Sequence, residues 1–300
     1  MNVEKDKKLI AGNHFIIKKK RRIGQYVNFY VWITLGCLVI LIPLYIMLIC
    51  SVMTPAETND STFHWWPEQG FSLEGYELAF NTDLGGVTII KGFFNTLLIY
   101  VPSILVGCFT SALAAYAFAK LEFRTKAAAF AILMFGMTLP NSMSTAASVI
   151  LFDMIGWVDT LLPLMVPRMM GTIGIVFFLR QFYMSVPDDL IEAGYIDGFG
   201  HLRIFFYVML PLAIPSMLAQ FILTFITAYN DFLSPLLYLP NNIEYAPVSL
   251  VIQNFSGAYS QIWCLKMAAC ALTMFPLLIL YLISQKIMLK GVAITSGLKG

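Results

Sequence analysis

The stretch "VNFYVWITLGCLVILIPLYIMLICSVM", residues 27–53, contains no charged side chain. A helix of about 20 apolar residues is long enough to cross the hydrocarbon core of a bilayer, so this stretch predicts a membrane-spanning helix. Of the 300 residues in the chain, 59% are hydrophobic and only 12% are charged, whereas a soluble domain carries about 25% charged residues. The composition therefore predicts an all-α integral membrane protein and excludes an ordinary soluble globule.

Six segments are apolar and long enough to span a membrane. In chain order they are 27–53, 92–118, 127–150, 161–180, 205–228 and 267–285. Sixteen of the 19 lysines and arginines then fall on the same side as the two termini, and an excess of basic residues marks the cytoplasmic side. We expect six transmembrane helices with both termini in the cytoplasm. The expected organisation is a basic cytoplasmic tail over 1–26 and one membrane domain over 27–300.

The longest cytoplasmic loop between these spans, 181–204, contains "EAGYIDG" at 192–198. Pro187 and the two aspartates after it suit the first turn of a helix, where the helix dipole favours negative charge. Gly198 follows Asp197 at a predicted turn, because glycine can take a positive φ. The sequence predicts a short acidic helix, a glycine turn and a second helix that continues into the fifth span. On these grounds alone, a solvated connector explains the loop equally well.

Two stretches resemble a known family. The first carries Glu192, Ala193, Asp197, Gly198, Phe205, Leu210 and Pro211. Their spacing is similar to that of the EAA loop of ABC importer permeases, although Gly194 replaces an alanine and Phe199 replaces a small residue. The second, "FITAYNDFLSPLLYL" at 225–239, resembles the F-x-x-x-W-N-D-F-x-x-P-L stretch of carbohydrate-importer permeases, with Tyr229 in the tryptophan position. The chain is thus similar to maltose-type permease subunits.

This resemblance implies one permease subunit of a binding-protein-dependent ABC importer in the bacterial cytoplasmic membrane, between membrane lipids. The subunit would form half of the path for a sugar or oligosaccharide, and the 187–203 loop, between helices 4 and 5, would couple it to a separate ATPase dimer. The implied coupling residues are Asp188, Glu192, Ala193, Gly194, Asp197, Gly198 and Phe199. A second, non-identical permease and an extracellular or periplasmic sugar-binding protein are the other implied partners. A permease for a non-sugar solute is the alternative.

No catalytic motif is present. The chain lacks the G-x-x-x-x-G-K-[ST] loop that holds phosphates, and it lacks H-E-x-x-H and G-x-S-x-G. We therefore expect no enzyme activity, no catalytic residue, no metal site and no cofactor in this chain, with ATP and Mg bound by the partner ATPase. We expect no nucleic-acid partner. An ATPase-independent channel would need a ring of pore-lining charges or a filter sequence, and neither is visible.

Candidate residues for the substrate path lie in and beside the spans. Tyr229, Asn230 and Asp231 fall at the outer end of the fifth span, and an aromatic ring beside planar polar groups suits a sugar. The alternative for these residues is helix capping, with hydrogen bonds that fix the end of the span. Asn95 in the second span is a further candidate, and we expect its amide to form hydrogen bonds between helices.

Arg168 is a charge inside an apolar run. Seven residues into the fourth span, it would lie ~10 Å deep at 1.5 Å per residue. Because a buried charge is costly, we expect it to face a cavity or one of three carboxylates, at Asp153, Asp159 or Asp231. It is either a ligand contact, for example to an acidic sugar, or part of a structural ion pair.

Two long segments, 54–91 and 229–266, fall on the outer side. Both are expected to lie on the membrane surface or to reach a partner, because neither has a core of its own. The stretch "QNFSGAYS" at 253–260 is expected to be an external loop. The resemblance implies that this loop contacts the sugar-binding protein, with Gly257 allowing a tight tip and Tyr259 able to stack on a sugar ring.

Overall fold

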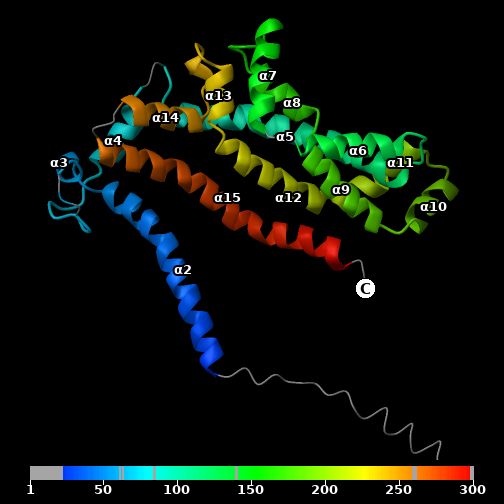
Figure 1. Cartoon of the computed structure of the whole chain (residues 1–300), viewed down its shortest axis with the longest axis horizontal. Coiled ribbons are helices and arrows are strands. Elements are labelled where there is room, and N and C mark those ends of the chain that lie inside the picture. Colours follow the sequence, from blue (N-terminus) through cyan, green and yellow to red (C-terminus); the bar gives the residue numbers. More distant parts are fainter. Residues whose placement is uncertain are drawn as a thin grey trace, which may run out of the picture. The chain divides into compact units, whose positions relative to one another are not determined.

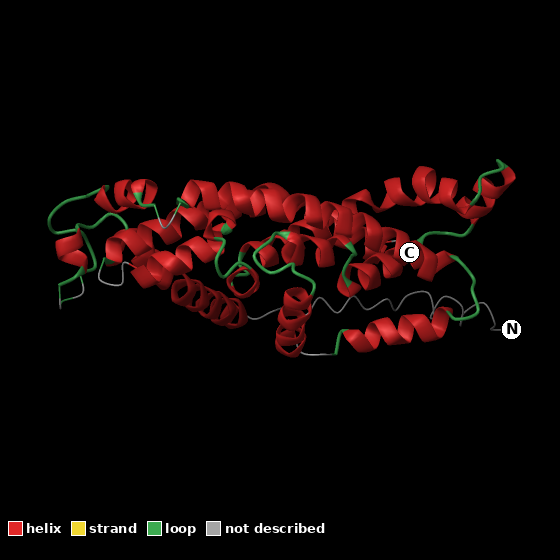
Figure 2. Ribbon diagram, turned by 90° about the horizontal axis from the view of Figure 1, so that it is seen from above, coloured by secondary structure: helices red, strands yellow, loops and turns green. Residues whose placement is uncertain are grey.

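The computed structural model describes residues 23–60, 62, 64–83, 86–138, 141–258 and 262–297. Every regular element in these ranges is a helix, and none of the described residues forms a β-strand (Figure 2). The chain divides into two parts, Met1–Ile46 and Met47–Gly300. For the described residues, the prediction of an all-α protein is confirmed.

Figure 1 follows the chain from α2 to α15. The elements are α2 (Ile23–Cys50), α3 (Pro55–Thr58), α4 (Glu74–Asn81), α5 (Ile89–Lys120), α6 (Lys126–Gly136), α7 (Asn141–Met154), α8 (Leu162–Met169), α9 (Ile173–Ser185), α10 (Asp189–Ile196), α11 (His201–Ile204), η1 (Phe205–Met209), α12 (Leu210–Tyr229), α13 (Leu233–Tyr238), η2 (Ile243–Tyr245), α14 (Val248–Ala258) and α15 (Trp263–Gly297). Among the described residues, five helical stretches are long and apolar enough to cross a membrane. They are Tyr26–Cys50, Ile89–Lys120, Leu162–Ser185, His201–Tyr229 and Trp263–Lys286. They correspond to five of the six predicted segments.

The predicted third span, 127–150, does not form one long helix in the described residues. It is divided between α6, with 11 residues, and α7, with 14 residues. Each is shorter than the ~20 residues that cross a bilayer. The sequence places Pro140 between them, and a proline disfavours helical backbone at the residue before it. Apolar composition alone therefore overestimated the continuity of this segment.

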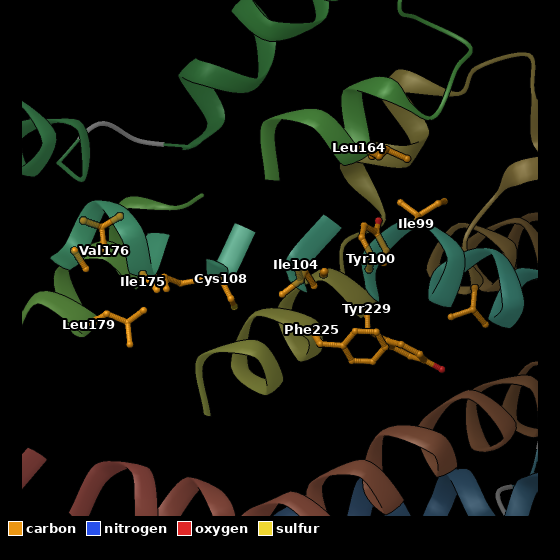
Figure 3. Close-up of a cluster of buried hydrophobic side chains, with 14 of the residues drawn as sticks. Ile99, Tyr100, Ile104, Cys108, Leu164, Ile175, Val176, Leu179, Phe225 and Tyr229 are labelled. Atoms are coloured by element: carbon orange, nitrogen blue, oxygen red, sulfur yellow. The ribbon is translucent and has the colours of Figure 1, made fainter. Parts of the chain in front are cut away.

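α5 forms the centre of the core in the second part of the chain. It packs against α8, α9, α12 and α14, and its buried positions recur every three or four residues, as one face of a helix does. Ile99, Ile104 and Cys108 lie in one cluster with residues of α8, α9 and α12 (Figure 3). The same face carries Gly107 and Ser111, and small residues allow another helix to approach closely.

The fourth span is interrupted, as its prolines and glycines predicted. α8 and α9 are separated at Gly171, which has a φ of +92°. The Thr110 hydroxyl donates to the carbonyl of Met169 at 2.9 Å, and the Ser111 hydroxyl accepts from the backbone N–H of Thr172 at 3.1 Å. A broken membrane helix is tolerated where neighbours satisfy the freed backbone groups. Here α5 satisfies them.

The fifth span runs without a break over His201–Tyr229. Its backbone becomes π-helical over Phe205–Met209, and the N–H of Leu210 donates to the carbonyl of Phe205, five residues earlier. Pro211 follows directly, has no N–H, and crowds the carbonyl four residues before it. The wider π turn accommodates this crowding, so the helix continues from α11 through η1 into α12 without a helix end.

The outer segment 229–266 contributes to the core, which contradicts the expectation that it only lies at the surface or reaches a partner. α14 buries Val248 and Val251 and packs against α5 and α15. The backbone N–H of Val248 donates to the Thr96 hydroxyl at 2.9 Å. The Asn95 amide donates to two backbone carbonyls of the connection before α14, at 2.9 and 3.1 Å. Polar side chains of α5 therefore fix the position of α14.

Candidate functional site

The segment 187–203 folds into the predicted helix, turn and second helix. α10 ends at Ile196, and Gly198, two residues later, has a φ of +78°. The N–H of Phe199 donates to the carbonyl of Gly194 at 2.9 Å, and the N–H of Gly198 donates to that of Tyr195 at 3.0 Å. This pair of bonds is the Schellman motif, in which a residue with positive φ ends a helix. The turn is therefore set by backbone geometry that favours glycine at one position.

The structure gives a reason for both departures from the EAA pattern. Gly194 is buried, and a Cβ there would lie 3.0 Å from Cγ1 of Ile204, so the glycine allows α10 to pack against the next helix. Phe199 is half-buried, with its ring centroid 6.1 Å from that of Tyr207. Its ring thus packs largely within the chain.

A lysine from α5 holds the entry to α10. The ammonium group of Lys120 donates to the carbonyl of Val186 and to a carboxylate oxygen of Asp188, each at 2.6 Å. The Lys120 side chain is only 7% exposed, whereas Asp188 is mostly exposed. At the other end of α10, the Tyr195 hydroxyl and Nδ1 of His201 lie 2.7 Å apart. Sequence reasoning missed Lys120, because nothing in its local sequence indicates that it reaches 66 residues along the chain.

The face of α10 that remains open is both acidic and apolar. Glu192, Ala193 and Asp197 are exposed. Ile196 is 86% exposed and Leu202 on α11 is 66% exposed. Exposed aliphatic side chains rimmed by polar groups are typical of sites that contact another protein or a membrane. Ile196 was not predicted, although its position four residues after Glu192 places both on one helical face.

A pocket of about 380 Å³, which we call the polar pocket for its amide and hydroxyl groups, lies at the C-terminal end of α12. Its polar groups come from Tyr229, Asn230, Ser249, Gln253 and Thr273, at the end of α12 and on α14 and α15. The rest of the described lining is apolar, and none of the described lining side chains is charged. The hydroxyl of Tyr229 donates to the carbonyl of Thr273 at 2.8 Å, and its ring lies beside Phe225 (Figure 3). Two of the three residues predicted at this helix end therefore line one pocket.

Asn230 also has the role that helix capping predicts. It is the C-cap of α12, and its side-chain amide donates to the carbonyl of Ile226 at 2.8 Å. The side chain is nevertheless exposed and lines the pocket. Capping and ligand contact are thus compatible here, because the amide oxygen is not needed for the cap.

Arg168 forms an ion pair, as one of the two interpretations predicted. Its Nη2 lies 3.2 Å from Oδ2 of Asp231, and its Cζ lies 4.9 Å from the ring centroid of Tyr100. The other carboxylate oxygen of Asp231 accepts from the N–H of Ser234 at 3.1 Å. Neither Arg168 nor Asp231 belongs to the described lining of the polar pocket. Asp159, another of the three expected partners, instead accepts hydrogen bonds from Asn241.

The two residues predicted to contact a binding protein have different outcomes. Gly257 is exposed but lies in the last turn of α14 and does not have a positive φ, so the predicted tight tip is wrong at this residue. Helix α14 includes the first residues of the expected loop because its apolar face packs on α5. Tyr259 lies outside the described residues. Within the part of the chain that the structure describes, no group of three or more His, Cys, Asp or Glu residues could hold a metal ion.

Comparison with known proteins identifies the family. The family model described as "binding-protein-dependent transport system inner membrane component" matches residues 104–294, more than half of the chain. The chain belongs to this family. It is an ABC importer permease of the inner membrane, and the resemblance seen in the sequence is confirmed. Members of this family are transport permease components and not enzymes.

Individual relatives agree with this assignment. A probable ABC transporter permease of Pyrococcus horikoshii is 31% identical over 230 residues, which cover 76% of this chain and 82% of that protein. The sn-glycerol-3-phosphate transport system permease protein UgpE of Pectobacterium atrosepticum is 29% identical over 280 residues, covering 91% and 97%. The permease fold is also seen in a bacterial ABC transporter that imports the acidic polysaccharide alginate, with a TM-score of 0.76 at 20% identity, covering 88% of this chain and 96% of that one.

Proposed function

We propose that this permease carries a neutral sugar or oligosaccharide and forms half of the translocation path with a second, non-identical permease subunit. The polar pocket supports this substrate class. It offers a tyrosine ring with amide and hydroxyl groups and no charge in its described lining. Arg168 was the candidate for binding an acidic solute, and its guanidinium group is already paired with Asp231. A phosphate or carboxylate would therefore find no free counter-charge here, which favours a neutral solute over the acidic ones that two similar proteins carry.

The proposed topology has six crossings, with α6 and α7 together forming the third and both termini in the cytoplasm. The basic side chains on the side of the 187–203 loop support this orientation. Residues 1–26 would then be a cytoplasmic tail, and 27–300 the permease domain.

The proposed coupling surface is the open face of α10 and α11. Glu192 and Asp197 would accept charge-assisted hydrogen bonds from the cytoplasmic ATPase dimer, while Ile196 and Ala193 would be buried against it. Gly198 sets the angle between the two short helices. The ATPase would bind ATP and Mg, and this chain would contribute no cofactor site.

In the proposed cycle, closure of the ATPase dimer moves the 187–203 segment, which continues into the fifth span through the π turn. A sugar-binding protein delivers the solute at the outer end, near the pocket and the C-terminal end of α14. The permease then alternates between two states that bind these partners with different affinity. The single observation that carries the coupling proposal is a rigid, exposed acidic and apolar helix whose turn is fixed by the positive φ of Gly198.

Glu192→Lys tests this proposal by reversing the charge on the docking face. We expect co-purification of the ATPase in detergent to fall by about tenfold or more, since a lost charge-assisted bond costs roughly 1.5–3 kcal/mol. Gly198→Asp should keep the protein in the membrane but abolish solute-stimulated ATP hydrolysis. Glu77→Lys, on an exposed residue of α4, is the matched charge reversal away from α10. If both variants kept wild-type association and stimulation, the loop would be a connector only.

A substrate panel tests the sugar assignment separately. ATP hydrolysis by the reconstituted importer with its binding protein is measured with maltose, sn-glycerol-3-phosphate and an amino acid. We expect stimulation by a neutral sugar and a higher half-saturation concentration in the pocket variant Gln253→Ala. Stimulation only by the phosphate or amino acid would support the alternative of a non-sugar permease.

A further inference from the structure

A second pocket, of about 480 Å³, lies at the C-terminal end of α5 and shares no lining residue with the polar pocket. Its lining includes Glu122, Phe123, Arg124, Lys126, Phe130 and Arg180. These residues come from the connection between α5 and α6, from the first turns of α6, and from α9. We call it the basic pocket. It is separate from the coupling face of α10.

Arg180 is held in a fixed position in the basic pocket. Its Nε donates to the carbonyl of Phe118 at 3.2 Å, and its Cζ lies 4.1 Å from the ring centroid of Phe130. A guanidinium group has five N–H donors, so the contact to Phe118 leaves most of them free. Among the described residues, no carboxylate forms an ion pair with Arg180 or Arg124. The side chain is thus oriented without being neutralised.

The charge of the basic pocket is unbalanced. Three cations, Arg124, Lys126 and Arg180, share it with one carboxylate, Glu122. That carboxylate lies 3.0 Å from the ammonium group of Lys126, but the Glu122 side chain is 90% exposed, and an exposed pair of this kind is weak. Two positive charges therefore remain, and a phosphate-type anion would be favoured here over water.

The surroundings of the basic pocket favour an amphiphile over a free anion. Phe123 contributes to the lining and is also exposed. α6 begins at Lys126 in the pocket and has no buried residue along its length. Further along α6, Ile132 is 72% and Phe135 is 67% exposed. A head group in the pocket could thus have its acyl chains beside an apolar helix, as basic pockets between membrane helices bind anionic head groups.

We propose that the basic pocket binds the head group of an anionic phospholipid in the leaflet that the 187–203 loop faces. Arg180 provides the preorganised contact to the phosphate. Arg124 and Lys126 close over it from the side of α6, and the Glu122 carboxylate opposes binding. The site anchors α6 and the cytoplasmic end of α5, and it is independent of which solute the permease carries.

The test is a lipid titration of the purified full-length permease by native mass spectrometry, with phosphatidylglycerol and phosphatidylcholine as probes. We expect preferential retention of phosphatidylglycerol. Arg124→Gln combined with Lys126→Gln should weaken that retention by roughly 30-fold, from about fivefold for each basic residue near the membrane surface. Glu122→Gln should strengthen it, and Arg203→Gln, an exposed arginine outside the pocket, should leave it unchanged.

The double variant should weaken lipid retention and Glu122→Gln should strengthen it, so one variant still tests the proposal if the other folds poorly. Equal retention of both lipids would overturn it, as would an unchanged preference for phosphatidylglycerol in the double variant. Inorganic phosphate is the third probe. Complete displacement of the lipid by millimolar phosphate would assign the site to a free anion and overturn the lipid proposal. A preference that survives phosphate supports it.

Discussion

Gly107→Ala should disrupt the packing of the second and fourth spans. A Cβ at Gly107 would lie 2.2 Å from the carbonyl oxygen of Arg168, whereas non-bonded heavy atoms are ordinarily about 3.5 Å apart. The obstacle is backbone, so no side-chain rotation can relieve it. α5 and α8 would have to separate by roughly 1 Å.

The cost follows from what that separation breaks. Overpacking of a close helix contact costs about 1–3 kcal/mol. The same movement lengthens the hydrogen bonds of Thr110 and Ser111 to the broken backbone at Met169 and Thr172, and each buried group left unsatisfied costs a further 1–3 kcal/mol or so. A total near 3 kcal/mol would lower the unfolding temperature by roughly 5–10 °C. Uptake should fall as well, because Arg168 moves relative to Asp231.

The assay is thermal unfolding in detergent together with solute uptake at matched expression. Gly174→Ala is the control, since a Cβ there meets nothing within 4 Å and alanine is favoured over glycine in a helix by up to ~1 kcal/mol. Gly174→Ala should therefore be neutral or slightly stabilising. If Gly107→Ala melted at the wild-type temperature and transported normally, the described contact between α5 and α8 would be wrong.

Three further predictions concern the charged groups. Lys120→Met removes two 2.6 Å contacts to the entry of α10, and it should lower the amount of solute transported per ATP hydrolysed several-fold while the ATPase still co-purifies. Lys91→Met, which breaks an exposed ion pair, is the control. An equal ratio of transport to hydrolysis in both variants would refute a role of Lys120 in coupling. Arg168→Ala should lower the free energy of unfolding by roughly 1 kcal/mol without changing the half-saturation concentration for uptake. Adding Asp231→Asn should restore part of that stability. A changed half-saturation concentration would instead indicate that Arg168 contacts the solute. Hydrogen bonds from the side chain and backbone of Asn241 lower the pKa of the Asp159 carboxyl. The contribution of Asp159 to the free energy of unfolding is therefore complete above its pKa in the unfolded chain, and it is lost as the pH falls through its pKa in the folded protein. Asp159→Asn, which tolerates the positive φ at this position, should remove this acid dependence from the melting curve, and an unchanged acid profile would count against it.

The sequence by itself determined the class of the protein and the local structure of its most informative loop. Five of the predicted spans and the Gly198 turn depend on local properties, namely apolar length and the permitted φ of glycine. The same holds for the interruption of the fourth span, where glycine and proline act on the backbone near them. Such features are readable from sequence because their causes lie within a few residues.

The tertiary structure decided what depends on distant partners. Sequence reasoning proposed three carboxylates for Arg168, and only packing selected Asp231, 63 residues away. The segment 229–266 was expected to lie on the membrane surface or reach a partner. Its packing was not predictable, because the hydroxyl and amide groups of α5 that fix α14 lie about 150 residues earlier in the chain. The sequence did not indicate that Lys120 contacts the entry of α10. It also did not indicate that α6, which begins in the basic pocket, is exposed along its length. Contacts of this kind depend on which helices pack together, and a single apolar helix has several faces that composition alone cannot distinguish.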